Sequence, residues 1–375
     1  MRWSWLQHSS PIWSNMPGLA KRGARWLAVL GVALLSAEAA SRFDDAVFAD
    51  VPVFSNPDRE ADLTVPEIWG ARGKPRGHFR KWTLNSFGFL GPEMTQSPTR
   101  RRAMILGASE TFGLFESAGN DYPAQLQREL DRRNAGVEIV NAALPGMALP
   151  SISAYWEEWA SQFRPDLVLI YPSSHFYLSD EVPKRQPLLA APRQLTAPRL
   201  QSRFAERIKD TIKQLPALRA LRSWFVVSQA LAGHGPGYLF TADPPPDRLA
   251  AFERDLEALA GAVVERGAVP ILITHAFQTP SPPAQSDMAT LEYFRIFLPR
   301  ALPAAIPAFE AAARKAVLAL GQRRGWRVID AAGSFSGHRE LFADPVHFND
   351  EGSRRMAALI GEQLTAGSIT SGGQR

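Results

Sequence analysis

The alternation of short apolar runs with longer amphipathic segments is the feature that most limits how this chain can fold. It begins at residue 103 and continues almost to the C-terminus. The runs are rich in aliphatic and β-branched residues and nearly continuous, which is typical of strands buried on both faces of a parallel sheet. They are Ala103–Gly107, Val137–Ala142, Leu167–Tyr171, Val269–Thr274 and Trp326–Asp330.

The segments between these runs have the length and periodicity of helices. Two of them end on a basic residue followed by glycine, at Arg266-Gly267 and Arg324-Gly325, as helices commonly do. Strands that alternate with helices predict an α/β fold, a three-layer α/β/α sandwich around a five-stranded parallel sheet. The expected helices are Tyr122–Arg133, Ser151–Gln162, Leu249–Arg266, Pro307–Arg324 and Asp350–Leu364.

Composition divides the chain into further parts. Residues 43–100 are rich in proline and glycine and predict an irregular extension ahead of an α/β domain at residues 101–367. Residues 179–247 are too many for a connection within a compact domain, so we expect a helical insertion there. A flexible tail is expected at residues 368–375.

Residues 1–42 predict a signal peptide or a membrane anchor. Lys21, Arg22 and Arg25 precede the run Trp26–Ala37, which is typical of the apolar part of a signal peptide and shorter than the ~20 residues that cross a bilayer. A cleaved peptide, a retained anchor and a helix buried in the domain are the alternatives. In the first two, the basic flank stays in the cytoplasm and the rest is exported, to the periplasm or the outer side of the inner membrane.

Composition excludes several kinds of site and partner. The chain has no cysteine, so disulfides, thiolate nucleophiles and cysteine-ligated metals are excluded. The net charge is +5, and basic residues gather at 100–102 and between 184 and 222. No zinc-finger spacing or aromatic RNA-binding pattern accompanies them, so we expect no nucleic-acid partner.

Ser109 stands directly after the first expected strand. Ligands of open α/β sheets bind beyond the carboxyl ends of the strands, so this serine is a candidate site residue. The small Gly107 and Ala108 leave space for a ligand, and backbone N–H groups in such a turn can face an oxyanion. Thr111 occupies the second glycine position of the G-x-S-x-G motif, which excludes that motif. The alternative role for Ser109 is an ordinary helix N-cap.

Two further motifs follow other expected strands. Gly146 either lets the backbone approach a ligand or simply forms a turn with Pro145. Asp344 and His347 stand three residues apart just before the last helix. The carboxylate can therefore hold one imidazole nitrogen while the other accepts a proton from a serine. A plain surface loop is the alternative; no second ligand cluster accompanies the pair, so we expect no metal and no cofactor.

Together these motifs resemble the sequence blocks of the SGNH (GDSL) hydrolase family, over residues 103–364. The resemblance implies Ser109 as nucleophile, His347 as general base and Asp344 as the residue that orients the base. It also implies that the backbone N–H groups of Ser109 and Gly146 form part of the oxyanion hole. Ala108 departs from the family, which has aspartate before the serine.

A second departure follows the third strand, where the family has an asparagine that donates to the oxyanion. This chain reads YPSSHFY at residues 171–177. Ser173, Ser174 and His175 are the candidate substitutes, since each can donate a hydrogen bond. Loss of one such donor costs ~10²–10³ in rate. Substrate binding and plain packing are alternative roles for His175.

The resemblance implies an exported serine esterase, whose expected substrate is an O-acyl group on a glycan or another envelope component. Two alternatives stay open. One is an acyltransferase that uses the same triad to acylate a sugar hydroxyl; the other is a catalytically weak glycan-binding protein, which the missing asparagine favours. The membrane is a further partner if residues 1–42 are uncleaved. Protonation of His347, near pH ~6.5 for an ordinary histidine, would stop catalysis.

Overall fold

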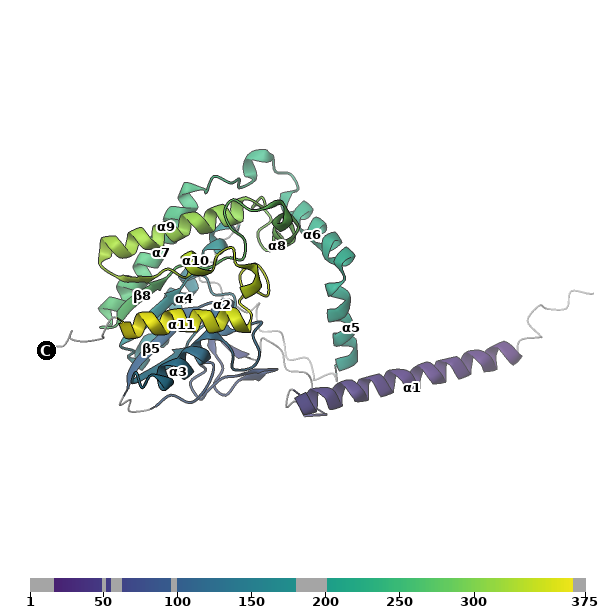
Figure 1. The fold of residues 1–375 in the computed structure, drawn as a ribbon. Helices are drawn as coiled ribbons and strands as arrows, with labels where there is room; N and C mark the ends of the chain where they lie inside the picture. The colour runs from purple at the N-terminus through teal and green to yellow at the C-terminus, as the bar shows by residue number, and fades with distance from the viewer. Residues whose placement is uncertain (1–16, 49–51, 55–62, 96–99, 180–200, 367–375) are drawn as a thin grey trace, which may run out of the picture. The chain divides into compact units, whose positions relative to one another are not determined.

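The structure of the chain is a computed structural model, which describes residues 17–48, 52–54, 63–95, 100–179 and 201–366 (Figure 1). The chain divides into two units. The first, here called the anchor unit, comprises residues 1–57 and 197–213. The second, the α/β unit, comprises residues 58–196 and 214–375.

The α/β unit is built on a five-stranded parallel sheet with the strand order β6-β5-β7-β8-β9. Each strand lies within or overlaps one of the five apolar runs, so the predicted strands and fold class are confirmed. The chain turns from β5 to one neighbour, β6, and then crosses to the other, β7; such a switch point is where open sheets bind ligands. The strands are β5 (Arg101–Gly107), β6 (Val137–Asn141), β7 (Leu167–Tyr171), β8 (Val269–Ile273) and β9 (Arg327–Ile329).

Helices cover both faces of this sheet. Helix α3 packs against α11, and α7 packs against both α4 and α9 (Figure 1). These helices are α3 (Tyr122–Arg132), α4 (Leu149–Glu158), α7 (Pro246–Glu265), α9 (Ala305–Arg324) and α11 (Asp350–Ala366).

The core consists of two apolar clusters, because successive residues of a strand point to opposite faces. Val168 and Ile170 of β7 belong to the cluster that contains Leu256 of α7. Leu169 of the same strand belongs to the other cluster, with Leu126 of α3. The continuous apolar pattern of β7 therefore reflects burial on both faces.

The second expected helix, Ser151–Gln162, has different bounds in the structure. Helix α4 begins at Leu149, with Pro150 in its first turn, and ends at Glu158. A separate 3₁₀ helix, Ala160–Phe163, follows it. Proline fits the first turn because an N–H at that position would have no intrahelical partner. The sequence pattern does not predict this start.

Residues 43–100 are more regular than predicted. They contain two antiparallel hairpins, β1 (Thr64–Glu67) with β2 (Gly70–Gly73), and β3 (His78–Phe79) with β4 (Trp82–Thr83). Strands of two to four residues are too short to show an alternating pattern. Residues 85–91, a segment with two phenylalanines, follow these hairpins. They pack beside the sheet, where Leu90 bridges Asn141 at the end of the edge strand β6.

The described part of the expected insertion, residues 201–247, is helical as predicted. It contains α5 (Arg203–Gln214) and α6 (Pro216–Leu231). Helix α6 contacts α8 (Met288–Phe294). Residues 180–200 of the insertion and the expected tail at 368–375 lie outside the described residues.

The anchor unit contains α1 (Pro17–Phe48), a single helix of 32 residues. Its Arg22–Val47 segment is long and apolar enough to cross a membrane, and 6% of its most apolar window is buried. Trp26, Leu30 and Leu35 are among its exposed apolar side chains. A helix buried in the domain was therefore a wrong alternative. Helix α1 continues past residue 42, the predicted boundary, to Phe48.

Candidate active site

Ser109 lies at the switch point of the sheet. Strand β5 ends at Gly107, and Ser109 is the first residue of α2 (Ser109–Phe112), whose N-cap residue is Ala108. The N-cap position belongs to Ala108, and the bonds of the Ser109 hydroxyl are to Glu110 and His347, so the N-cap interpretation is wrong. A side chain at Gly107 would lie 2.2 Å from the Thr111 hydroxyl oxygen, which explains why the sequence has glycine before this turn.

The structure brings the three predicted triad residues together. Nε2 of His347 lies 2.9 Å from Oγ of Ser109, and Nδ1 of His347 lies 2.8 Å from both carboxylate oxygens of Asp344. The same carboxylate accepts the backbone N–H groups of Val346 at 3.0 Å and His347 at 2.9 Å. Asp344 is therefore fixed by its own loop, and it orients the imidazole toward the serine.

The loop around the triad is anchored to the helix that follows. Asn349 accepts the backbone N–H of Gly352 at 2.9 Å, which caps α11. A Cβ at Gly352 would lie 2.0 Å from the carbonyl oxygen of Leu341. This close approach holds the start of α11 beside the loop that carries Asp344 and His347.

Burial and neighbouring charges act in opposite directions on His347. Its side chain is 11% exposed, and the ring of Phe115 packs against it at 4.9 Å. Burial lowers the pKa of His347, but the hydrogen bond that its ring donates to Asp344 and the negative charge of Glu110 outweigh burial and raise this pKa above 6.5. The imidazolium form is thus stabilised at this position.

The two backbone N–H groups expected in the oxyanion hole have no partner in the described residues. Within the part of the chain that the structure describes, neither Ser109 nor Gly146 donates its backbone N–H to another protein group. Gly146 has a φ of 76°, a left-handed conformation that glycine adopts without steric cost. Free N–H groups of this kind are the donors that an oxyanion requires.

The third-strand candidates lie in a buried polar cluster. The Ser173 hydroxyl donates to Glu110 at 2.8 Å, and the Ser174 hydroxyl donates to Glu310 at 2.5 Å. A hydroxyl has one proton, so in this arrangement neither serine has a proton left for an oxyanion. Nδ1 of His175 lies 3.2 Å from Glu310. Its Nε2 forms no hydrogen bond with the described residues.

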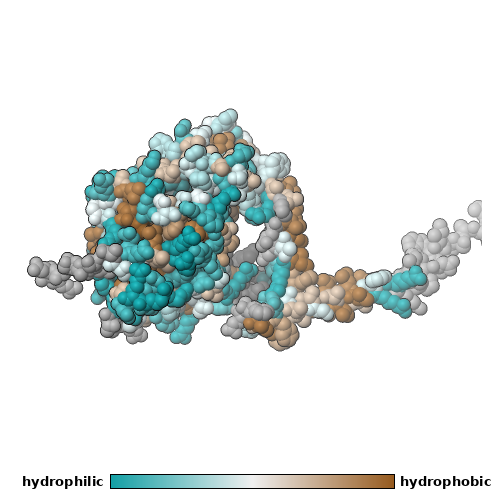
Figure 2. Space-filling model, viewed as in Figure 1, coloured by the Kyte–Doolittle hydropathy of each residue, from teal (hydrophilic) through white to brown (hydrophobic). Residues whose placement is uncertain are grey.

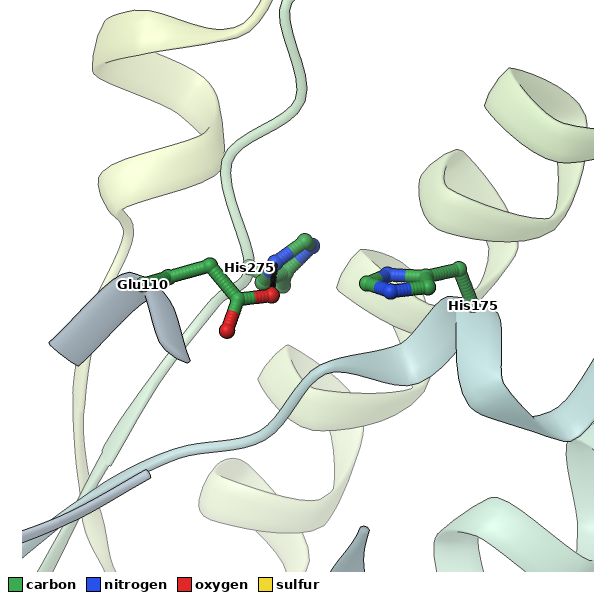
Figure 3. A group of neighbouring side chains, drawn as sticks. All are labelled: Glu110, His175 and His275. Carbon is green, nitrogen blue, oxygen red and sulfur yellow. Dashed lines mark hydrogen bonds and ion pairs between the residues drawn. The ribbon is translucent and has the colours of Figure 1, made fainter. Parts of the chain in front are cut away.

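His275 is the centre of this cluster and was missed in the sequence. Nδ1 lies 2.9 Å from Glu310. Nε2 lies 3.3 Å from Glu110 (Figure 3). The other carboxylate oxygen of Glu110 is 3.3 Å from the Ser109 hydroxyl. His275, Glu110 and Glu310 are all at most 5% exposed. The signal that could have revealed them is a polar residue directly beyond a buried strand, at Glu110 after β5 and His275 after β8.

The charges of the cluster stabilise one another. Burial lowers the pKa of His275, but the charges and hydrogen bonds of Glu310 and Glu110 outweigh burial and raise it to about 10. Burial raises the pKa of both glutamates, yet the histidines hold the pKa of Glu310 at about 2 and that of Glu110 well below its usual range. At neutral pH the cluster therefore contains an imidazolium between two carboxylates.

Glu110, His175 and His275 also offer ligand atoms within 4.8 Å of one another, as a metal site would. His275 uses both ring nitrogens in hydrogen bonds inside the protein, and Oε1 of Glu110 accepts from Ser173 and contacts His275. Metal binding would have to replace these bonds. We therefore interpret the cluster as an ion network.

Comparison with known proteins finds similar structures but no similar sequence. No protein-family model and no curated protein matches the chain. A lipase/acylhydrolase from Enterococcus faecalis is 17% identical, with a TM-score of 0.42, over 71% of this chain and 96% of that chain. A lipolytic protein of the G-D-S-L family from Desulfitobacterium hafniense is 13% identical, with a TM-score of 0.39, over 70% and 99%. A catalytic mutant of an acetylxylan esterase from Geobacillus stearothermophilus is 14% identical, with a TM-score of 0.41, over 72% and 96%.

His275→Gln will destabilise the α/β unit by about 3–5 kcal/mol, because removal of one partner leaves buried carboxylates without their counter-charge. Urea unfolding at pH 6 measures this free energy. His338→Gln is the matched control, since the His338 side chain is 56% exposed and pairs with Glu340 on the surface. Equal stability of the two variants would contradict an ionised cluster.

The wild-type chain will lose stability as the pH rises from about 6.5 to about 10. The pKa of His275 is raised on folding, so its contribution is complete below the unfolded-state pKa of ~6.5 and disappears as the pH passes its folded-state value of about 10. Unfolding free energies measured across this range test the sign. In His275→Gln this part of the pH dependence will be absent.

Proposed function

We propose that this chain is a serine hydrolase of the SGNH (GDSL) type that cleaves carboxylic esters. The observation that carries the proposal is the hydrogen-bonded series from the Ser109 hydroxyl through both nitrogens of His347 to the Asp344 carboxylate. A half-buried serine with a histidine base, oriented by a carboxylate, is the arrangement that nucleophilic acyl transfer requires.

Acylation follows from this geometry. Oγ of Ser109 attacks the ester carbonyl while its proton moves to Nε2 of His347, and the carbonyl oxygen becomes an oxyanion. The backbone N–H groups of Ser109 and Gly146 stabilise that charge. The C–O bond to the alcohol then breaks, and the Nε2 proton moves to the leaving oxygen. The products are a free alcohol and an ester of Ser109.

Deacylation repeats these steps with water. His347 accepts a proton from water, the resulting hydroxide attacks the acyl-serine, and the same N–H groups stabilise the second oxyanion. Collapse releases the carboxylic acid and returns the proton to Oγ of Ser109. An acceptor hydroxyl in place of water gives acyl transfer by the same residues, which is the alternative outcome of the test below.

Glu110 contributes through charge. Its carboxylate lies 3.3 Å from the Ser109 hydroxyl and raises the pKa of His347. It therefore stabilises the imidazolium that forms during attack. Without a counter-charge, however, the same carboxylate would repel the developing oxyanion. The positive charge of His275 on the opposite side of the carboxylate limits this repulsion.

We extend the proposal to place and substrate. The apolar α1 and the basic residues before it support export, with the α/β unit outside the cytoplasm, in the periplasm or anchored to the inner membrane. Envelope glycans carry O-acyl groups in that compartment, so we propose an acylated glycan or envelope component as the ester substrate.

A fluorophosphonate probe will label the wild-type chain at Ser109, and Ser109→Ala will abolish the labelling. Ester hydrolysis will fall in parallel, by a factor of order 10⁶ in kcat where chemistry limits the rate. Gel fluorescence and peptide mass spectrometry report the labelled residue. The exposed Ser117→Ala is the matched control and will label normally. Labelling that does not depend on Ser109 would leave the glycan-binding alternative.

Hydrolysis and transfer are separated by product analysis with an acetylated oligosaccharide. Free acetate will form at a rate that an added acceptor sugar does not reduce, because water completes the proposed reaction. Chromatography and mass spectrometry quantify acetate and acetylated acceptor. Acetate release that depends on the acceptor, with an equal yield of acetylated acceptor, would assign the chain to acyl transfer instead.

The acid limb of kcat/KM against pH will have its midpoint above 6.5, because the surroundings of His347 raise its pKa. The sequence alone predicts a midpoint near pH ~6.5, the value of an ordinary histidine. In Asp344→Asn the limb will move to lower pH, since the carboxylate that raises the pKa is gone, and kcat will fall by about 10⁴. A rate that stays flat from pH 5 to pH 8 would exclude His347 as the base.

A further inference from the structure

Helix α5 is fixed to the C-terminal part of α1 within the anchor unit. The Glu38 carboxylate accepts the backbone N–H groups of Arg203 at 3.1 Å and Phe204 at 3.0 Å, and the Ser202 hydroxyl at 2.7 Å. A carboxylate at the first turn of a helix satisfies N–H groups that lack an intrahelical partner. Glu38 of α1 is thus the cap of α5.

Ion pairs extend this contact along the first turns of α5. Arg207 pairs with Asp44 at 2.5 Å and with Asp45 at 2.6 Å. The Arg203 side chain is 1% exposed and lies 3.3 Å from Asp45. The charged end of α1 therefore determines where α5 starts.

The contact lies at the level where α1 changes from apolar to charged. From Arg22 to Arg42 a helix rises about 30 Å at 1.5 Å per residue, which equals the thickness of a bilayer's hydrocarbon core. Arg42 also donates to the backbone oxygen of Gln201, just before α5, at 3.0 Å. If α1 crosses a bilayer, α5 begins at its surface.

One face of α5 is apolar and exposed. Phe204, Ile208 and Ile212 are four residues apart and share a face. Ile208 is 42% exposed and Ile212 is 46% exposed. Glu206 and Lys209 lie outside this stripe and pair with each other at 3.3 Å. Figure 1 shows α5 running crosswise to α1, and Figure 2 shows hydrophobic residues along α5.

We propose that α5 is an interfacial helix that lies on the non-cytoplasmic surface of the membrane crossed by α1. A helix crosswise to a membrane span, starting at the surface and exposing an apolar stripe, meets the requirements for burial between acyl chains and headgroups. The occupant of the stripe formed by Phe204, Ile208 and Ile212 is therefore lipid.

The proposal requires that α1 is retained, and the contacts above support retention. Cleavage at the A-x-A-like site, residues 37–39, would remove Glu38 or separate it from α5. It would leave the N–H groups of Arg203 and Phe204 without their acceptor. These bonds serve a purpose only in a chain that keeps α1, which favours the anchor over the signal peptide.

The test uses the full chain in lipid vesicles, with one cysteine introduced at a time. Because the natural sequence has no cysteine, Ile208→Cys, Ile212→Cys and Glu206→Cys each give a single labelling site. An environment-sensitive fluorophore is attached, and nitroxides placed near the headgroup end of the acyl chains quench it where it contacts lipid. Glu206 lies outside the apolar stripe on the same helix and is the matched control.

We expect blue-shifted emission and at least threefold stronger quenching at positions 208 and 212 than at 206. Equal, weak quenching at all three positions would overturn the proposal and indicate that water or protein covers the stripe. Intact-mass measurement of the membrane-extracted chain is the second arm, and a mature chain that starts after Ala39 would also overturn it. Neither failure affects Ser109 labelling, so the proposed function is tested separately.

Discussion

The buried ion network around His275 is the interaction on which the site depends. His275 follows β8 and binds Glu110, which follows β5, and Glu310 of α9, which in turn binds Ser174 after β7. Three strand ends and one helix are thereby held at fixed separations. Because Glu110 adjoins Ser109 in the chain, the position of the nucleophile is fixed by the same bonds.

Burial of such a network costs free energy, so it favours a single arrangement of the strand ends around it. Each charge loses its hydration, and only well-placed partners offset that loss. The network supplies those partners: both carboxylate oxygens of Glu310 and Oε1 of Glu110 accept hydrogen bonds. A displaced β7 or β8 end would leave a charge unpaired, so alternative packings of this edge of the sheet are strongly disfavoured.

The sequence predicts the strands of the sheet and the catalytic triad for different reasons. Burial on both faces makes the run Leu167–Tyr171 continuous, and the structure has a strand with those bounds. Asp344 and His347 are recognisable because they stand three residues apart in one loop, so their interaction is local in the sequence. The partners of His275 stand 165 and 35 residues away, and a single polar residue after a strand has many possible roles. Only the folded sheet shows that they meet.

The same network also defines which charges can change during catalysis. Its histidine loses a proton only near pH 10, and its glutamates remain ionised throughout the neutral range. Beside the triad, burial raises the pKa of Glu116 to about 7, where Ser353 donates to its carboxylate. Ionised Glu116 raises the pKa of His347 further. The negative charge that Glu116 gains as it ionises therefore stabilises the imidazolium of His347, the form that arises when His347 accepts the Ser109 proton.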